Sequence, residues 1–254
     1  MTKIVSVHSF RGGTGKSNIT ANLAAALGAK GHRVGVVDTD IQSPGIHALF
    51  DLDASKIKHS LNDYLWGRCQ IEETAYDVSG VLRSAGYKQE QIYLIASSLR
   101  LGEIARILRD GYDVEMLNDG LQDLIKIFNL DYLLIDTHPG INEETLLSLT
   151  ISDVLLIILR PDRQDFQGTA VTVEVARKLQ VPNLMLVVNR VLQVYDADAL
   201  KQKVETTYGA PVAGLLPNSD EMMQLASSDI FYLRFPQHPL SRVIDDIAKQ
   251  VIAA

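Results

Sequence analysis

The chain has 254 residues, of which 46% are hydrophobic, and a chain of this size can bury a full core. Its formal net charge of −7 disfavours a protein wrapped in nucleic acid, so a nucleic-acid partner would need a local basic patch. The single cysteine, Cys69, excludes an internal disulfide, a four-cysteine zinc site and a complete iron–sulfur ligand set within one chain.

Short runs rich in β-branched and aliphatic residues recur along the chain, with helical patterns between them. We expect strands at Ile4–Val7, Arg33–Val37, Ile92–Ile95, Tyr132–Ile135, Val154–Leu159, Leu184–Val188 and Val212–Leu215. Several runs are apolar on both faces, which is typical of a parallel sheet that helices cover on both sides. We expect crossover helices at Asn18–Ala29, Val114–Phe128, Thr169–Leu179 and Ala197–Tyr208. The pattern predicts a doubly wound α/β fold with a mostly parallel sheet, and residues 1–254 form one expected domain because no linker interrupts them.

Residues 41 to 90 are the least regular part of the chain. They contain Trp66 and the breaks at Gly80 and Gly86, so we expect an insertion of short helices and loops beside the site.

A glycine-rich loop, FRGGTGKS at residues 10 to 17, stands between the first expected strand and the first helix. Glycines at 12, 13 and 15 allow positive φ and close approach, so successive N–H groups can surround a phosphate at the helix N-terminus. Lys16 would place its charge near the β and γ phosphates, and the Ser17 hydroxyl would bind magnesium. The residues expected to bind the nucleotide here are Gly12, Gly13, Thr14, Gly15, Lys16, Ser17 and Asn18.

The loop departs from the strict GxxxxGK[ST] pattern because Phe10 stands at the first glycine. The alternative is a glycine turn with a fortuitous lysine, which the order of strand, loop and helix disfavours.

The loop contains a second cationic residue, Arg11, which indicates one particular family among the proteins with such a loop. The segment resembles the deviant Walker A loop, KGGxGK[ST], of the MinD/ParA ATPases, and the resemblance covers residues 3 to about 228. It implies an ATP-bridged homodimer in which the residue at position 11 reaches the partner's phosphates. The family has lysine at this position; arginine keeps the charge but is bulkier and binds phosphate as a planar fork. The alternative is a surface arginine at the mouth of the loop.

Acidic residues follow two of the expected strands. Asp38 and Asp40 come directly after Arg33–Val37, and alternate residues of an extended chain project to one side. The resemblance assigns Asp38 to magnesium and Asp40 to the attacking water, whereas the alternative is an ordinary acidic turn. Asp136, after Tyr132–Ile135, is expected to meet magnesium as a Walker B acid.

The segment after Asp136 resembles the second switch loop of the family. There the Gly140 N–H would approach the γ-phosphate. We do not assign His138 as a general base, because phosphoryl transfer depends mainly on positioning and a lone loop histidine is more often solvated. The other histidines have no metal-ligand spacing, and we expect no zinc.

The base is expected to bind after Leu184–Val188. A protein that recognises guanine through an NKxD motif needs an acid at position 192. That residue is Leu192, which cannot accept hydrogen bonds from guanine, so we expect adenine. The resemblance assigns Asn189 and Arg190 to the base pocket, together with backbone groups around Pro217. The alternative for Pro217 is a simple strand-end turn.

The C-terminal stripe of Val243, Ile244, Ile247, Val251 and Ile252 lies opposite two aspartates, so we expect a helix that packs on its own core rather than a membrane-targeting helix. Because the chain also lacks a signal peptide and an apolar stretch of about 18 residues, we expect a cytoplasmic protein.

These exclusions favour a ParA-like positioning or partitioning ATPase: an ATP-dependent switch with slow hydrolysis that an adaptor protein stimulates. Nonspecific DNA binding is a further hypothesis, with these candidate contacts: Arg100, Arg106, Arg109, Arg234 and Arg242. Two alternatives stay open, a nucleotide-dependent scaffold with little hydrolysis and a small-molecule kinase or ligase.

Overall fold

The computed structural model describes residues 2–87 and 91–254. Its strands form one sheet in the order β3-β4-β2-β5-β1-β6-β7-β8, in which only β3 runs antiparallel to its neighbour. The strands are β1 (Lys3–His8), β2 (Val34–Asp38), β3 (Ala75–Asp77), β4 (Ile92–Ile95), β5 (Tyr132–Asp136), β6 (Val154–Leu159), β7 (Asn183–Val191) and β8 (Val212–Pro217). All seven expected strands are present, and the doubly wound α/β fold is confirmed.

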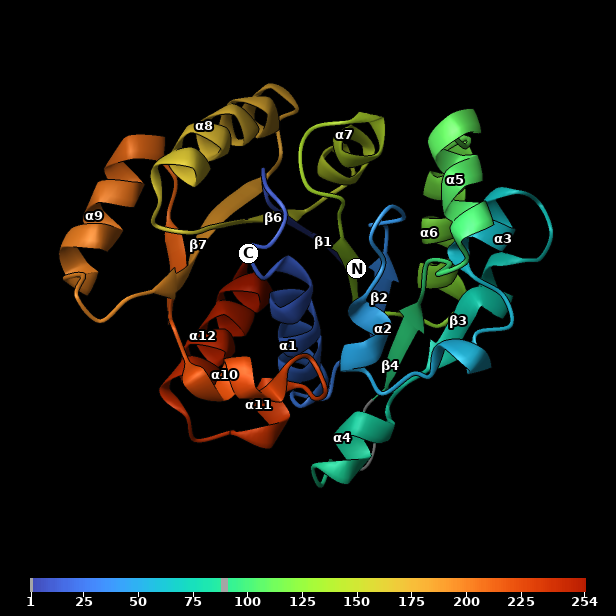
Figure 1. Cartoon of the computed structure of the whole chain (residues 1–254), viewed down its shortest axis with the longest axis horizontal. Helices are drawn as coiled ribbons and strands as arrows, with labels where there is room; N and C mark the ends of the chain where they lie inside the picture. The colour runs from blue at the N-terminus through green and yellow to red at the C-terminus, as the bar shows by residue number, and fades with distance from the viewer. Residues whose placement is uncertain (1, 88–90) are drawn as a thin grey trace.

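Helices cover both faces of this sheet (Figure 1). One face carries α1 (Lys16–Gly28) and α12 (Pro239–Ala253), with α2 (Ile46–Leu49), α4 (Gly80–Ser84), α10 (Asp220–Leu225) and α11 (Phe231–Arg234) around them. The other face carries α3 (Leu61–Leu65), α5 (Leu101–Asp110), α6 (Val114–Ile127), α7 (Glu143–Thr150), α8 (Arg163–Lys178) and α9 (Ala197–Tyr208). Each layer buries aliphatic side chains of the sheet, which explains why the central strands are apolar on both faces.

The expected helices are present with small shifts at their ends. Helix α8 begins at Arg163 rather than Thr169, because the Asp162 carboxylate caps it and accepts from the N–H groups of Gln164 and Asp165. Helix α7 and strand β3 were not expected. In residues 41 to 90 the structure has short helices, including two 3-10 turns at Ala54–Lys56 and Ile71–Thr74; residues 88–90 lie outside the described residues.

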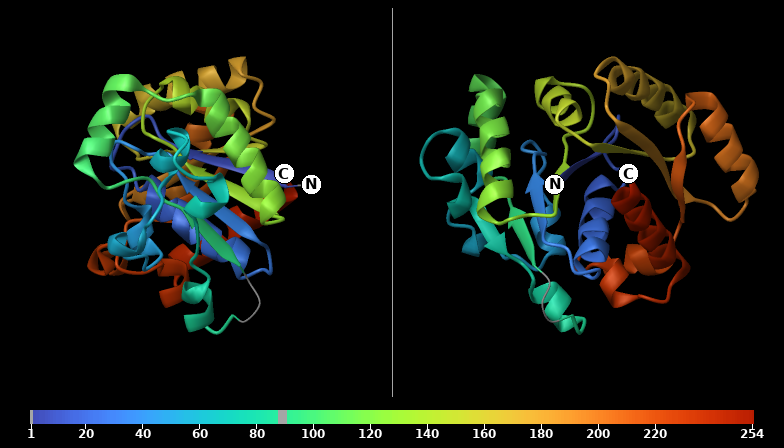
Figure 2. Two further views of the ribbon diagram at one scale, coloured as in Figure 1. Left: turned by 90° about the vertical axis from the view of Figure 1, so that its right-hand side faces the viewer. Right: turned by 180° about the vertical axis from the view of Figure 1, so that it is seen from behind.

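The C-terminal helix packs on the core, as its apolar stripe predicts. Ile244, Ile247 and Val251 of α12 are fully buried against α1 and β8. The Lys3 ammonium donates to the carbonyl oxygens of Val251 and Ile252 at 3.0 Å each, so the two ends of the chain lie side by side (Figure 2). Among the helices of the described residues, none combines the length and the apolar character that crossing a bilayer requires.

The sheet order brings three strand ends together. Strand β5 lies between β1 and β2, and Asp38 is in register with Asp136. Because parallel strands end at the same edge, the loops after β1, β2 and β5 surround one cavity at this edge.

Candidate functional site

The glycine-rich loop joins β1 to α1 and lines a cavity of about 330 Å³. Gly13 and Gly15 adopt positive φ, 76° and 94°, whereas Gly12 does not. Gly12 instead faces Pro139, and a Cβ on it would come within 3.9 Å of that ring. Every residue from 12 to 18 lines the cavity, and contact of these residues with a nucleotide stays a prediction.

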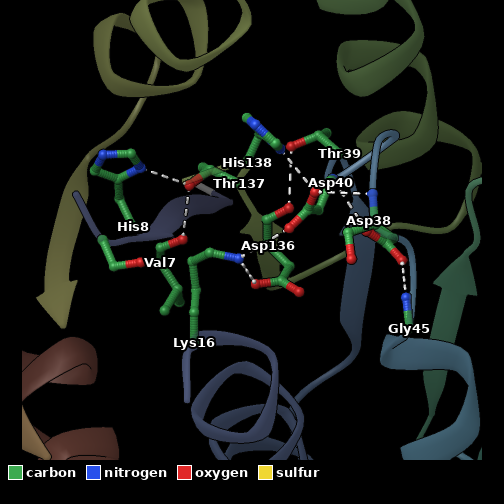
Figure 3. A network of polar contacts seen from close by, with 12 residues as sticks. Val7, His8, Lys16, Asp38, Thr39, Asp40, Gly45, Asp136, Thr137 and His138 are labelled. Atoms are coloured by element: carbon green, nitrogen blue, oxygen red, sulfur yellow. Dashed lines mark hydrogen bonds and ion pairs between the residues drawn. The ribbon is translucent and has the colours of Figure 1, made fainter. Parts of the chain in front are cut away.

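Lys16 reaches from the first turn of α1 into a cluster of acids (Figure 3). Its Nζ atom lies 3.3 Å from Oδ1 of Asp136 and 3.6 Å from Oδ2 of Asp40. The lysine is only 6% exposed, so its charge is compensated by carboxylates rather than by water. The structure therefore brings together the cation and two of the three acids that we singled out.

Asp38 and Asp136 are both about 1% exposed. Burial raises the pKa of Asp38 well above its usual range, and the carboxylates of Asp136 and Asp40 add to the shift. Burial also raises the pKa of Asp136, although Lys16 and Ser17 oppose this. Two of the three acids contact the single ammonium of Lys16, and burial together with the neighbouring acids favours the protonated form of the third, Asp38.

The oxygen atoms of these two acids differ in their partners. Both oxygens of Asp38 accept backbone bonds, from the N–H groups of Asp40 at 3.0 Å and Gly45 at 3.3 Å. Oδ2 of Asp136 is buried and has no hydrogen-bond partner. A buried carboxylate oxygen without a partner, in register with a second buried acid, fits a site for a hydrated divalent cation. Ser17 and Asp40 line the neighbouring cavity of the glycine-rich loop.

His138 is partly buried and paired with an acid, so it is not the lone, solvated histidine that we expected. Its Nδ1 atom lies 2.7 Å from Oδ1 of Asp40, and its side chain is 18% exposed. The spacing along the chain does not indicate this pair, because the two residues are 98 positions apart. Gly140 has the positive φ of 87° that suits a glycine, but its N–H donates to the Ser9 carbonyl at 3.1 Å.

A second buried histidine was not singled out from the sequence. The Thr137 hydroxyl donates to the Val7 carbonyl at 3.1 Å, so its oxygen accepts from Nδ1 of His8 at 2.7 Å. Burial lowers the pKa of His8 to about 3, and the charges of Lys16 and His138 contribute. His8 is therefore neutral at physiological pH and fixes the loop that follows Asp136.

The glycine-rich loop of residues 10 to 17, called the phosphate loop from here on, packs against the beginning of α8. Nη1 of Arg11 lies 2.7 Å from Oε1 of Gln164, 3.3 Å from Oδ1 of Asp165 and 3.5 Å from Oδ1 of Asp162. The ring of Phe10 lies against Gly168, where a Cβ would be 2.0 Å from its Cδ1 atom. A phenylalanine fits at the position of the first Walker A glycine because the residue of α8 that faces its ring, Gly168, has no side chain.

A second cavity, of about 280 Å³, lies beside Gly15 and Asn18. Asn189, Arg190 and Pro217 all line it, and their assignment to the base stays a prediction. Nδ2 of Asn189 donates to the Thr14 carbonyl at 2.7 Å, so the residue that the resemblance assigns to the base also holds the phosphate loop.

The five arginines considered for DNA binding do not form one patch with free charges. Arg100 pairs with Glu103, and Arg106 and Arg109 pair with Asp110 on the same helix. Arg234 and Arg242 lie on α11 and α12, on the opposite face of the sheet from α5.

The geometry agrees with comparisons to known proteins. A family model for ParA, described as NUBPL iron-transfer P-loop NTPase, matches residues 1–252. The chain belongs to the ParA family of P-loop NTPases.

Three relatives illustrate the range of this family. An uncharacterized ATP-binding protein of Methanocaldococcus jannaschii is 26% identical over all of this chain and 89% of that protein. The flagellum site-determining protein YlxH of Helicobacter pylori is 28% identical over 80% of this chain and 63% of that protein. The cytosolic Fe-S cluster assembly factor CFD1 of Phaeosphaeria nodorum is 33% identical over 56% of this chain and 48% of that protein.

Solved structures share the fold over the whole chain. The cell division ATPase MinD of Pyrococcus furiosus has a TM-score of 0.81 at 20% identity and covers 100% of this chain and 99% of that one. MinD of Pyrococcus horikoshii, solved with Mg-ADP, has a TM-score of 0.79 at 20% identity and covers 99% of this chain and 96% of that one. The resemblance to MinD/ParA ATPases is thereby confirmed.

Proposed function

We propose that this ParA-family chain is a Mg²⁺-dependent ATPase that acts in the cytoplasm as an ATP-bridged homodimer and positions a cargo, either DNA or a protein. One observation carries the proposal. Lys16 is buried between Asp136 and Asp40 at the mouth of a loop whose residues from Gly12 to Asn18 line one cavity. A buried lysine at a helix N-terminus, beside glycines with positive φ, supports binding of a triphosphate.

The proposed metal site consists of Ser17, Asp38 and Asp136, and the orphaned oxygen of Asp136 supports it. When bound, magnesium would neutralise charge that develops on the phosphate oxygens. Its charge would also favour the ionised forms of Asp38 and Asp136, which burial disfavours. Lys16 would leave its carboxylate partners for the phosphates, since both compete for the same ammonium.

In the proposed reaction, Asp40 positions a water molecule whose oxygen forms a bond to the γ-phosphorus. The bond between that phosphorus and the bridging oxygen breaks, and ADP leaves with the electron pair. Both protons of the water end on the inorganic phosphate, so the step needs no further reactant. Asp40 lines the cavity of the glycine-rich loop, and its side chain is 11% exposed, which supports this role.

Adenine is the proposed base, because Leu192 cannot accept hydrogen bonds from guanine and its side chain is half exposed outside the base cavity. The relative named for ATP binding and the MinD structure with Mg-ADP support this choice.

Positioning is the proposed purpose, with an adaptor that stimulates hydrolysis, and the relative that determines the flagellum site supports it. Iron transfer, which the family model and CFD1 name, is less well supported. The chain has one cysteine, and burial together with the carboxylates of Asp63 and Glu73 raises the pKa of Cys69 to about 11. With one cysteine in each chain, a homodimer would supply two thiols at most, fewer than the four ligands of a typical cluster.

The experiment that tests the function measures ATP binding by calorimetry and phosphate release with magnesium. The unaltered chain should bind ATP and release phosphate, and Lys16→Ala should lose binding by at least about a hundredfold. Lys178→Ala, a lysine in the last turn of α8, is the matched control and should change neither quantity. Equal binding by Lys16→Ala and the unaltered chain would refute the proposal.

Measured phosphate release distinguishes the proposed ATP-dependent switch from the two alternatives, a nucleotide-dependent scaffold and a small-molecule kinase or ligase. A chain that binds ATP and dimerises but releases no more phosphate than its Asp40→Ala variant is a scaffold. A kinase or ligase would transfer the phosphate to an acceptor, and phosphate release would then depend on adding that acceptor.

A further inference from the structure

His138 and Asp40 form a pair across the edge of the sheet (Figure 3). Asp40 follows β2 and His138 follows β5, and their Oδ1 and Nδ1 atoms are 2.7 Å apart. An ionised carboxylate can only accept, so the Nδ1–H group of His138 donates. The distance is that of a charge-assisted hydrogen bond, which is stronger than a bond between neutral groups.

The pair is one of three contacts that fix the Asp40 carboxylate. Its Oδ1 atom also accepts from the Ser43 N–H at 3.3 Å, and its Oδ2 atom faces Nζ of Lys16 at 3.6 Å. The side chains of His138 and Asp40 are 18% and 11% exposed, so water competes little for these contacts. Both side chains line the phosphate cavity.

In the proposed function, ATP binding would change this balance. Lys16 would turn to the phosphates and leave Oδ2 of Asp40, and that oxygen would then be free to accept from a water molecule. His138 then remains as the side chain that holds Asp40, from the opposite oxygen. A carboxylate held at one oxygen can present the other in a single orientation, which is what a positioned water requires.

We propose that His138 is a positioning residue for ATP hydrolysis, which holds the Asp40 carboxylate toward the attacking water. This inference rests on the proposed function and adds a residue to its site. His138 acts through Asp40, so it should affect the rate of the chemical step and leave the affinity for ATP unchanged.

Three substitutions of His138 distinguish positioning from a general structural role. His138→Ala removes the donor. In His138→Asn the amide nitrogen stands near the position of Nδ1, whereas in His138→Gln it stands near Nε2. The measurements are phosphate release in a single turnover with excess enzyme, ATP affinity by calorimetry, and the thermal midpoint of each variant.

We expect His138→Ala to slow the single turnover by about tenfold to a hundredfold, with an ATP Kd within about twofold of that of the unaltered chain. His138→Asn should recover most of the rate, and His138→Gln should stay as slow as His138→Ala. A rate of His138→Ala equal to that of the unaltered chain would overturn the role of His138. So would a loss of ATP affinity as large as the loss of rate, or no recovery in His138→Asn.

The same experiment separates this inference from the function on which it rests. An unaltered chain that binds no ATP or releases no phosphate overturns the proposed ATPase and the role of His138 together. An active unaltered chain with an equally active His138→Ala overturns only the role of His138.

Discussion

Nη1 of Arg11 donates to Oε1 of Gln164 at 2.7 Å, so the second cation of the phosphate loop is directed toward α8 of its own chain. Asp162 and Asp165 add ion pairs at 3.5 and 3.3 Å. In the proposed dimer Arg11 would contact the partner's phosphates, and these contacts within one chain would have to break first. The beginning of α8 therefore competes with the nucleotide of the partner for one guanidinium.

Removing that competition should favour the dimer. Gln164→Ala should lower the concentration of a non-hydrolysable ATP analogue that is needed for dimerisation by about threefold to tenfold, because one hydrogen bond to a charged group is lost at a partly exposed site. Arg11→Ala should prevent dimerisation, and Arg11→Lys should restore it. Sedimentation velocity measures each case. Gln202→Ala, on the exposed face of α9, is the control, and a Gln164→Ala chain that behaves like it would contradict the prediction.

Gly168 should be essential although it lies inside a helix. Alanine usually stabilises a helix by about 1 kcal/mol relative to glycine. At position 168, however, its Cβ would lie 2.0 Å from the Phe10 ring and 2.8 Å from Cβ of Phe10, so the start of the phosphate loop must move. We expect Gly168→Ala to lower the free energy of unfolding by about 1–3 kcal/mol and to weaken ATP binding at least about tenfold.

Two comparisons test the cause of that loss. Gly102 lies in α5 with open space around it, so Gly102→Ala should be neutral or stabilising in the same urea titration. Phe10→Ala combined with Gly168→Ala should bind ATP better than Gly168→Ala alone, since the clashes with the ring at 2.0 and 2.3 Å are gone and only the 2.8 Å contact with Cβ of residue 10 remains. If the double variant were no better, contact with Phe10 would not be the reason for the glycine.

Asn189 should contribute to phosphate binding as well as to base binding. Its Nδ2 atom donates to the Thr14 carbonyl at 2.7 Å, and its Oδ1 atom accepts from the Arg190 N–H at 2.9 Å. Without the first bond the phosphate loop loses a support. Asn189→Ala should therefore weaken both ATP and inorganic triphosphate, each by about threefold to tenfold, as one hydrogen bond predicts. A loss restricted to ATP would mean that Asn189 reads only the base. Gln193→Ala, in the exposed loop after β7, is the control.

The central part of the fold is predictable from the sequence because burial leaves a simple pattern. Strand β6, VLLIIL, is buried at every position, so it is apolar throughout and can be recognised as an interior strand. Strand β3 has only three residues, Ala-Tyr-Asp, and none is buried, so nothing in its composition indicates a strand. Helix α7 has eight residues and only a weak separation of polar and apolar faces, which makes it similarly hard to detect.

The site is predictable where its residues are close in sequence. The loop from Gly12 to Ser17 combines glycines, a lysine and a hydroxyl within one segment, so the spacing alone indicates phosphate binding. The contacts of Arg11 with Gln164 and of His138 with Asp40 join residues 153 and 98 positions apart. Only the order of the strands brings these partners together, and a single sequence does not contain the register and loop geometry that decide such contacts.

His8 should make the stability of the protein depend on pH. Its ring is fully buried, its Nδ1–H donates to Thr137, and its Nε2 atom has no partner. Burial, with the charges of Lys16 and His138, lowers its pKa to about 3 from the usual 6.5. Between these two values the unfolded chain binds a proton that the folded chain does not. The stabilising difference is therefore complete above about pH 6.5 and declines as the pH falls toward 3.

The size of this effect follows from the two pKa values. At pH 5 the unfolded chain gains about 2 kcal/mol from protonation of His8. His8→Asn keeps an amide donor near Nδ1 but cannot titrate. Urea unfolding at pH 7.5 and at pH 5 should show that the variant loses about 2 kcal/mol less than the unaltered chain between these pH values. Equal losses of unfolding free energy in both chains would mean that His8 is protonated in the folded protein. The inference that His8 is buried in its neutral form would then be wrong.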